Sequence, residues 1–199
     1  GEAAMAEPLA VTLHATRRAG DMLGKSVLVT GCGPIGILSI LAARRAGADL
    51  VVATDLSDYT LAMAKKAGAD ITLNMAESAQ ALDAYKPDKG TFDVLYECSG
   101  AQVALTGAIP AMRPGATILQ LGLGGDMTLP MMQITAKELV LKGSFRFHPE
   151  YATAISLMQK KLIDVKPLIS ETVALQDAQK GFELANDRSR AMKVQIAFA

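Results

Sequence analysis

The chain has 199 residues, of which 50% are hydrophobic and 20% charged, so it can bury a substantial core. Lys and Arg together number 20, as do Asp and Glu, and this balance argues against nucleic acid or an acidic membrane as a partner. The two cysteines are too few for a disulfide framework or a Cys-rich zinc site, and they favour a reducing compartment, with the cytoplasm as the default.

The longest strongly apolar run covers residues 35–43 and ends at Arg44. It is well short of the roughly 20 residues that a membrane-spanning helix needs, so no membrane span is expected. The chain opens without an initiator Met and without the basic and apolar regions of a signal peptide. It is therefore expected to begin inside a longer protein.

The first third of the chain alternates strands with helices. Strands are expected at residues 26–30, 51–55 and 71–73, and helices at 37–46 and 59–67. The first two strands are continuously apolar rather than alternating, which favours a parallel sheet buried on both faces. Each helix ends in two cationic residues followed by Ala-Gly, a typical C-terminal signal, and Ser57 or Asp58 can cap the second helix. The repeat predicts a βαβαβ unit.

The middle of the chain continues this alternation. Further strands are expected at residues 92–97, 117–121 and 138–143, with a helix at 102–112. Pro114 and Gly115 are expected to turn the chain between that helix and the fifth strand. Because right-handed crossovers leave few alternatives, the pattern predicts an α/β fold with a doubly wound, parallel, six-stranded Rossmann sheet in the order 3-2-1-4-5-6.

The regular alternation of strands and helices ends at Pro149. Helices are expected at residues 151–161 and 175–185, an extended piece at 165–169 and a last strand at 193–198. This tail is expected to be part of another unit.

The stretch 27–36 (VLVTGCGPIG) places three glycines directly after a strand and at the start of a helix. Gly31, Gly33 and Gly36 form G-x-G-x-x-G, in which the first permits a tight turn, the second lets a pyrophosphate approach, and the third lets helix and strand pack closely. Pro34 falls in the first helical turn, where its missing N–H costs nothing, and the helix start favours an anion. The context predicts a dinucleotide site, although spacing alone also fits a plain turn.

Asp55 ends the second strand, where a carboxylate can hydrogen-bond the ribose hydroxyls of an adenosine. The competing interpretation is an aspartate that only caps the next helix. A carboxylate here repels a 2′-phosphate, and residues 56–60 (LSDYT) contain no Arg or Lys to receive one. NAD is therefore preferred over NADP. The other ligands of such a fold, S-adenosylmethionine and FAD, do not readily account for the later residues.

Five segments together carry a resemblance to a known family: residues 1–20, TGCGPIG, TDLS, LGLGGDMTLP and KGSFRF. They resemble the zinc-dependent polyol branch of the medium-chain dehydrogenase/reductases over essentially the whole chain. The resemblance implies a connecting segment at 1–20, an NAD-binding Rossmann domain at 21–147, and a C-terminal remnant of a GroES-like catalytic domain at 148–199. The family's N-terminal GroES-like part, which carries the zinc ligands, has no counterpart here, so zinc is implied only for a full-length enzyme.

The resemblance also implies roles for individual residues. Glu7 matches the family's glutamate that faces the catalytic zinc and its water or substrate, and Arg146 matches its substrate-side arginine; the plain alternatives are a surface glutamate and a solvated arginine. Contacts to the coenzyme are implied for Gly31, Gly33, Pro34, Ile35, Gly36, Asp55, Leu121, Gly122, Leu123, Ser144, Phe145 and Arg146.

The implied activity is NAD-dependent oxidation of a secondary alcohol of a small sugar acid or polyol. Sorbitol-type members carry a basic residue where this chain has Thr60 and a tyrosine where it has Phe147, which suits the idonate-type members of the branch better. Arg146 could then make a charge-assisted hydrogen bond to a substrate carboxylate. The alternative from another class is a stand-alone nucleotide-binding module without catalysis.

The remaining candidates carry weaker signals. His14 and His148 lie far apart without Cys or carboxylate at ligand spacing, so no metal site is expected in this chain. Cys32 lies at a helix start that could lower its pKa, or is simply a small residue tolerated beside pyrophosphate. Cys98 is most simply core, and Ser99 with Gly100 either approaches the coenzyme or turns the chain. The family resemblance implies a homodimer or homotetramer, with residues 125–132 in the interface.

Overall fold

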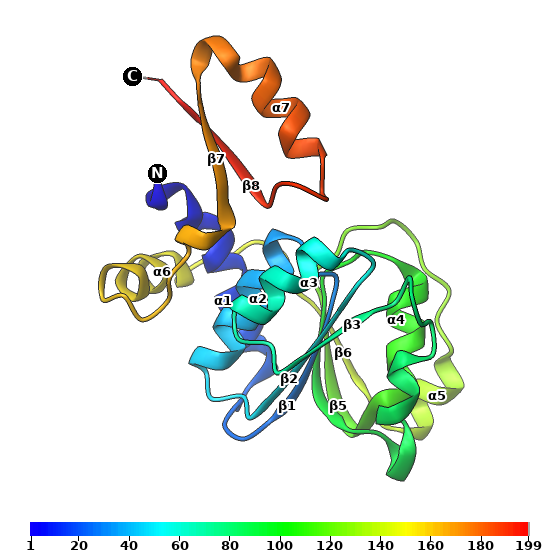
Figure 1. Cartoon of the computed structure of the whole chain (residues 1–199). Coiled ribbons are helices and arrows are strands. Elements are labelled where there is room, and N and C mark those ends of the chain that lie inside the picture. Colours follow the sequence, from blue (N-terminus) through cyan, green and yellow to red (C-terminus); the bar gives the residue numbers. More distant parts are fainter. Residues whose placement is uncertain (199) are drawn as a thin grey trace.

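A computed structural model describes residues 1–198 of the chain. It contains a six-stranded sheet with helices on both faces and a smaller two-stranded sheet that stands beyond one end of it (Figure 1). The strands are β1 (Ser26–Thr30), β2 (Leu50–Asp55), β3 (Ile71–Asn74), β4 (Phe92–Glu97), β5 (Met112–Gln120), β6 (Val140–Gly143), β7 (Ile169–Ala174) and β8 (Lys193–Ala197). The helices are α1 (Ala6–Ala19), α2 (Pro34–Arg45), α3 (Asp58–Lys66), α4 (Gln102–Ala108), α5 (Met131–Ala136), α6 (Glu150–Gln159) and α7 (Ala178–Asn186).

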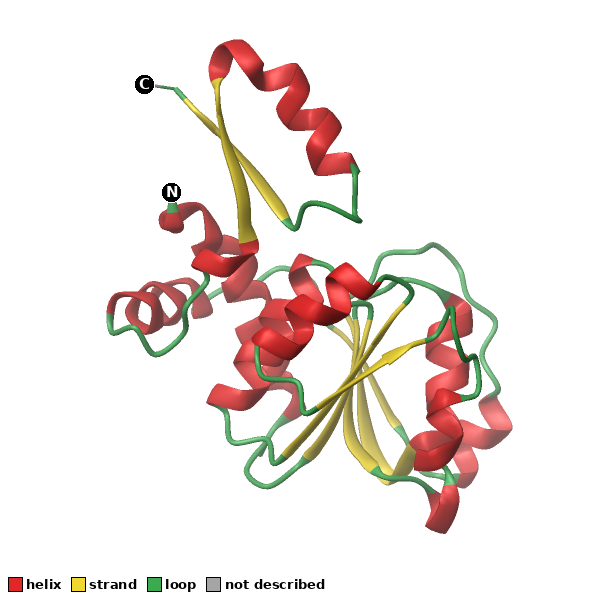
Figure 2. Ribbon diagram, viewed as in Figure 1, coloured by secondary structure: helices red, strands yellow, loops and turns green. Residues whose placement is uncertain are grey.

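The large sheet is parallel throughout, in the order β3-β2-β1-β4-β5-β6. The predicted doubly wound order is therefore confirmed. Neighbouring residues of β1 point to opposite faces, so that Val27 and Val29 join a core with α1, α2 and α3, whereas Leu28 joins a second core with α4. The continuous apolar runs follow from this burial on both faces, which Figure 2 shows as a sheet between two helical layers.

Two of the differences from the sequence prediction concern β5 and β7. Pro114 and Gly115 lie inside β5 rather than in a turn before it, in a bulge where the pairing with β4 jumps from Phe92–Met112 to Val94–Thr117. A bulge accommodates proline because the ladder is interrupted there. The extended piece expected at 165–169 is instead mostly a single 3-10 turn at Lys166–Leu168, and the strand β7 follows it.

Helix α1 was not predicted as a helix, yet it packs on the sheet between α2 and α6. The Tyr96 hydroxyl of β4 donates to Thr16 Oγ1 at 2.9 Å, and the Thr16 hydroxyl donates to the Thr12 carbonyl at 2.8 Å, all in buried surroundings. Its fully buried side chains include Leu9, Ala10 and Ala15. The segment before β1 therefore belongs to the core of the sheet domain.

Residues 150–198, which we call the C-terminal unit, are joined to α1 through the buried carboxylate of Glu150. Its Oε1 lies 3.2 Å from the Arg17 guanidinium and 3.3 Å from His14 Nδ1, the latter without a directed hydrogen bond. Its Oε2 accepts the His148 amide at 3.0 Å. Burial alone would raise the pKa of Glu150, but the backbone amides, His148 first, and the neighbouring His14 bring that pKa below its ordinary value.

We expect Glu150→Gln to destabilise the chain at pH 7 by about 1–3 kcal/mol, because it replaces a hydrogen-bonded buried carboxylate. A carboxyl group whose pKa is lowered by folding contributes stability above its unfolded pKa, about 4.3, and loses it as the pH falls through the folded value. Urea unfolding of both proteins from pH 7 downward should therefore show the difference shrinking below about pH 4.3. The exposed Glu77→Gln is the control, and a pH-independent difference would contradict the expectation.

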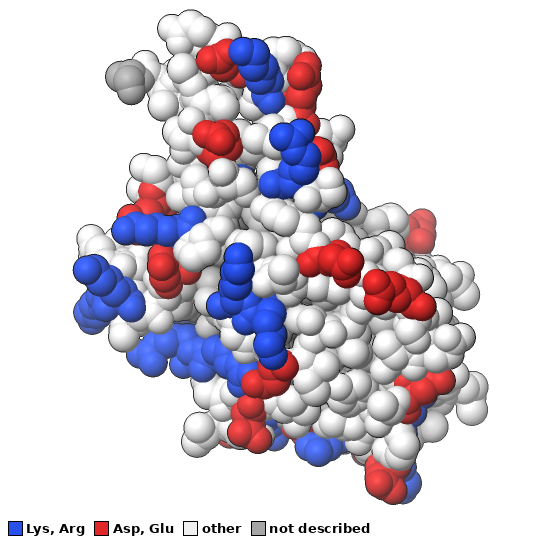
Figure 3. All heavy atoms as spheres, viewed as in Figure 1, with Lys and Arg blue, Asp and Glu red and all other residues white. Residues whose placement is uncertain are grey.

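Charge is dispersed over the surface. On the face drawn in Figure 3, basic and acidic side chains both lie over the C-terminal unit and over the flank of the sheet domain, and neither sign covers the face alone. Among the helices of residues 1–198, none combines the length and the apolar character that a membrane crossing requires.

Candidate functional site

The three glycines after β1 differ in what surrounds them. Gly31 has φ +83°, and a Cβ there would lie 2.7 Å from Ser99 Cα, while a Cβ on Gly36 would collide with the Gly31 carbonyl oxygen. Both are therefore required by packing. At Gly33 a Cβ would meet nothing within 4 Å. Gly33 thus borders open space at the point where the motif brings the backbone to a pyrophosphate.

Helix α2 begins at this open space. Gly33 is its N-cap, Pro34 occupies the first helical position, and Ile37 N donates to the Gly33 carbonyl at 2.9 Å. The first amides of an α-helix have no acceptor within the helix, which leaves those of Ile35 and Gly36 available to an anion, and the helix dipole has its positive end here. The geometry fits a phosphate group.

Asp55 stands beside this loop because β1 and β2 are neighbours and both end at the same edge. Its Oδ2 accepts the Cys32 amide at 2.6 Å, and its Oδ1 accepts the amides of Leu56 at 2.7 Å and Ser57 at 3.1 Å. The carboxylate thus orders the glycine loop and the chain before α3, whose N-cap is Ser57. A carboxylate oxygen can accept two hydrogen bonds, and Oδ2 accepts only the Cys32 amide, so Asp55 retains capacity for a ligand hydroxyl at Oδ2.

Of the two thiols near this loop, Cys32 is buried and Cys98 is partly buried. Cys32 has no exposed surface, and its Sγ donates to the Thr54 carbonyl at 3.5 Å. Burial, with the Asp55 carboxylate nearby, raises the pKa of Cys32, so the idea that the helix start lowers it is wrong. Burial also raises the pKa of Cys98 to about 12. A raised pKa disfavours the thiolate, which is the nucleophilic form of cysteine.

A second group of predicted residues follows β5 and β6. The Ser144 amide donates to the Gln120 carbonyl at 2.9 Å. Ser144 is only 6% exposed, yet its hydroxyl has no hydrogen-bond partner among the described residues, and Gln120 Oε1 is also buried and unpaired. Buried polar atoms without partners are uncommon in folded proteins. They indicate that this end of the sheet is suited to a polar ligand.

The exposed members of this group lie further out. Leu121 and Gly122 are half-buried, whereas Leu123 is 82% exposed and Phe145 is 67% exposed. Arg146 is exposed with φ +59°, and its guanidinium carbon lies 5.3 Å from the centre of the Phe145 ring. The structure thus places these side chains at the carboxyl ends of β5 and β6, in the same sheet edge as the glycine loop.

Glu7 lies in the first turn of α1 and is exposed. Thr16, near the C-terminal end of α1, is hydrogen-bonded to Tyr96 close to the carboxyl end of β4. The last residue of α1, Ala19, lies at the amino ends of the strands, so the helix runs antiparallel to the strands and its N-terminal half extends past their carboxyl ends. At about 1.5 Å of rise per residue, Glu7 stands about 13 Å beyond Thr16, outside the carboxyl edge of the sheet. Glu7 therefore stands on the same side of the sheet as the glycine loop.

The sequence analysis missed Glu97, the last residue of β4. Its side chain is fully buried, and the carboxylate accepts hydrogen bonds from Ser99, Gly100 and Gln120, which belong to the loop after β4 and to the end of β5. The available signal was a single acidic residue at the end of the apolar strand FDVLYE.

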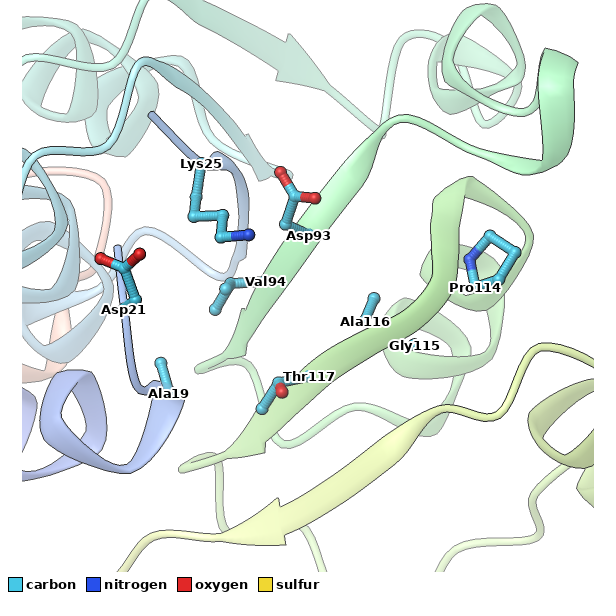
Figure 4. A pocket seen from close by; sticks show the side chains of 9 residues that line it. All are labelled: Ala19, Asp21, Lys25, Asp93, Val94, Pro114, Gly115, Ala116 and Thr117. Carbon is cyan, nitrogen blue, oxygen red and sulfur yellow. The ribbon is translucent and has the colours of Figure 1, made fainter. Parts of the chain in front are cut away.

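Two hollows lie near the sheet. One, of about 460 Å³, is bordered by Gln120, Gly122, Leu123 and neighbouring residues at the carboxyl end of β5. The other, of about 350 Å³, lies at the opposite, amino end of β1, β4 and β5 (Figure 4), where Asp21, Lys25 and Asp93 surround it. Asp93 there accepts the Ser26 amide at 2.8 Å and pairs with Arg113, which is a structural arrangement.

No three His, Cys, Asp or Glu side chains within residues 1–198 come together in a way that could hold a metal ion. His14 lies against Glu150, as described above, and the amide of His148 bonds the same carboxylate.

Comparison with known proteins places this geometry among dehydrogenases. A family model described as zinc-binding dehydrogenase matches residues 34–160. L-idonate 5-dehydrogenase (NAD(P)(+)) of Escherichia coli is 38% identical over 98% of this chain and 57% of that enzyme, and sorbitol dehydrogenase of Bos taurus is 39% identical over 98% and 56%. The crystal structure of the Escherichia coli L-idonate 5-dehydrogenase matches 98% of this chain and 56% of that chain with a TM-score of 0.94. The chain therefore spans little more than half the length of these relatives.

Proposed function

The chain belongs to the zinc-binding dehydrogenase family, and on that premise we propose that it is the coenzyme-binding part of an NAD-dependent dehydrogenase of a sugar acid or polyol. The observation that carries the proposal is the open space at Gly33, bounded by the start of α2 and by Asp55. A pyrophosphate fits at the start of α2, and an adenosine ribose fits beside Asp55.

We propose that the glycine loop and Asp55 bind one half of the coenzyme and that the ends of β5 and β6 bind the other half. The glycine loop, with Pro34, Ile35 and the first turn of α2, binds the pyrophosphate, and Asp55 orients the adenosine ribose. The ends of β5 and β6, with Leu121, Gly122, Leu123, Ser144, Phe145 and Arg146, hold the nicotinamide half. When bound, the nicotinamide would supply the hydride acceptor for oxidation of the alcohol.

We propose NAD rather than NADP because of the charge around the ribose. Asp55 presents a carboxylate at the end of β2, and residues 56–60 add the carboxylate of Asp58 and no cation. A 2′-phosphate placed there would be repelled and would find no Arg or Lys.

The substrate proposal rests on the relatives and on two residues of this chain. The relatives named above act on L-idonate and sorbitol according to their names. In this chain Arg146 would bind a substrate carboxylate by a charge-assisted hydrogen bond, and Glu7 would face the substrate from α1. The described residues do not fit a zinc ion, so the family's zinc would require ligands outside them, from a GroES-like part of the full-length enzyme.

The same proposal assigns a role to each part of the chain and to its contact with a second copy. Residues 1–20 would connect to the catalytic part, 21–147 would form the coenzyme domain, and 148–199 would return to the catalytic part. The exposed Val140 and Leu141 of the edge strand β6, with Met131 and Met132, would pair with a second copy. The two free cysteines agree with a cytoplasmic location.

A fluorescence titration of the chain with NADH tests the proposal. We expect saturable binding, because the groups that meet the pyrophosphate and the adenosine ribose are all present in residues 31–55. The fluorescence of NADH itself changes when the nicotinamide leaves water, so the chain needs no label. Absence of saturable binding at millimolar NADH, with a folded chain by circular dichroism, would contradict the proposal.

A further inference from the structure

We propose that Glu97 is a positioning residue that sets the spacing of the loops beneath the nicotinamide half of the coenzyme. The inference rests on the proposed coenzyme function and adds a residue that none of the site predictions included. Glu97 itself is too deeply buried to touch the coenzyme, so its effect is exerted through the loops that it holds.

The carboxylate of Glu97 connects one loop and the ends of two strands. Its Oε1 accepts the Ser99 amide at 2.9 Å and the Ser99 hydroxyl, and it lies 3.4 Å from the Thr30 hydroxyl at the end of β1. Its Oε2 accepts the Gly100 amide at 3.1 Å and Gln120 Nε2 at 2.7 Å. One side chain thus joins the end of β1, the loop after β4 and the end of β5.

The same loops approach each other more closely than side chains permit. A Cβ on Gly122 would collide with the Gly100 amide nitrogen and would lie 2.7 Å from Glu97 Oε2. A Cβ on Gly124 would collide with the Gly100 carbonyl oxygen. The glycine loop joins this contact, because Gly31 packs on Ser99. The glycines permit the two loops to approach closely, and the Glu97 carboxylate fixes the distance between them.

The surroundings of Glu97 do not balance it with a cation. In the described part of the chain, the ion pairs include no Lys or Arg on Glu97, so its oxygens are satisfied by N–H and O–H donors of the loops. A buried carboxylate without a cation is costly, and apolar packing would serve stability better. A role in ordering the amides of Ser99 and Gly100, in the loop after β4, accounts for a carboxylate at this buried position.

Glutamine cannot replace this carboxylate without conflict. In one orientation the NH2 group of a glutamine side chain would point at the donors of Ser99, and in the other it would point at those of Gly100 and Gln120. In either orientation two hydrogen-bond donors would face each other. Glu97→Gln should therefore loosen the loops while it preserves the volume of the side chain.

The test compares Glu97→Gln with Tyr96→Phe, which removes the buried hydrogen bond to Thr16 from the preceding residue of the same strand. Thermal unfolding, NADH titration and amide hydrogen exchange without coenzyme are measured for both. We expect Glu97→Gln to weaken NADH binding about tenfold or more and to accelerate exchange at Ser99 and Gly100. Tyr96→Phe should lower the melting temperature and leave the NADH affinity within about twofold.

A second variant, Gln120→Met, removes the β5 donor to Glu97, together with its hydrogen bond to the Gly122 carbonyl, and covers the case in which Glu97→Gln does not fold. It should weaken NADH binding in the same direction. Unchanged affinity in the folded variants, an equal loss in Tyr96→Phe, or unchanged exchange at Ser99 and Gly100 would each overturn the positioning role. If the unsubstituted chain binds no NADH, the coenzyme function fails, and the exchange data still decide whether Glu97 orders the loops.

Discussion

Gly33→Ala is expected to leave the chain folded and to weaken NADH binding by about a hundredfold or more, which is about 2.8 kcal/mol. Gly33 has φ −66° and ψ −175°, which alanine adopts freely, and its Cβ would meet no atom within 4 Å. The stability should therefore be retained or slightly increased. The new methyl group would occupy the space in which the pyrophosphate approaches the backbone. Circular dichroism and NADH titration measure the two effects separately.

Two other glycines serve as controls for this variant. Gly107 lies in α4, far from the glycine loop in sequence, and a Cβ there would meet no atom within 4 Å, so Gly107→Ala should bind NADH like the unsubstituted chain. Gly36→Ala should lose the fold and the binding together, because its Cβ would collide with the Gly31 carbonyl oxygen. Retention of full NADH affinity by Gly33→Ala would show that the open space is not the phosphate site.

The second large effect is expected at Asp55. The unsubstituted chain should bind NADH at least about tenfold more tightly than NADPH, about 1.4 kcal/mol, and Asp55→Asn should remove most of that preference. The substitution deletes the charge that repels a 2′-phosphate while one oxygen remains for the amides of Leu56 and Ser57. Parallel titrations with the two coenzymes give the ratio of affinities that the prediction concerns.

The ratio separates two consequences of the Asp55 substitution. Loss of the Cys32 amide contact loosens the glycine loop and should weaken both coenzymes alike, whereas loss of the charge should change only their ratio. Asp21→Asn is the matched control, since this exposed carboxylate also accepts an amide two residues along the chain, that of Leu23 at 3.1 Å, but lies at the amino ends of the strands. A ratio that does not change in Asp55→Asn would remove the basis for preferring NAD.

Residue patterns were sufficient for the sheet and for the glycine loop. The continuous apolar strands indicated burial on both faces, and the position of Gly31 to Gly36 between β1 and α2 was readable because both features are local. Local patterns failed at α1, whose few charged and many small residues gave no clear boundary, and at Pro114, where a bulge inside β5 resembles a turn. The interpretation of Cys32 as a thiol of lowered pKa failed because burial outweighs the helix start.

Strand alternation, glycine spacing and helix signals act over a few residues, so the order of the strands, the glycine loop and the acidic residue beside it could be predicted from the sequence. The contacts between residues distant in the chain, such as Tyr96 with Thr16 and Glu97 with Gln120, could not be read from the sequence. Such contacts depend on how strands far apart in the chain are brought side by side. A single acidic residue at the end of an apolar strand does not reveal its partners, so the contacts of the Glu97 carboxylate follow only from the packing of the strands and loops.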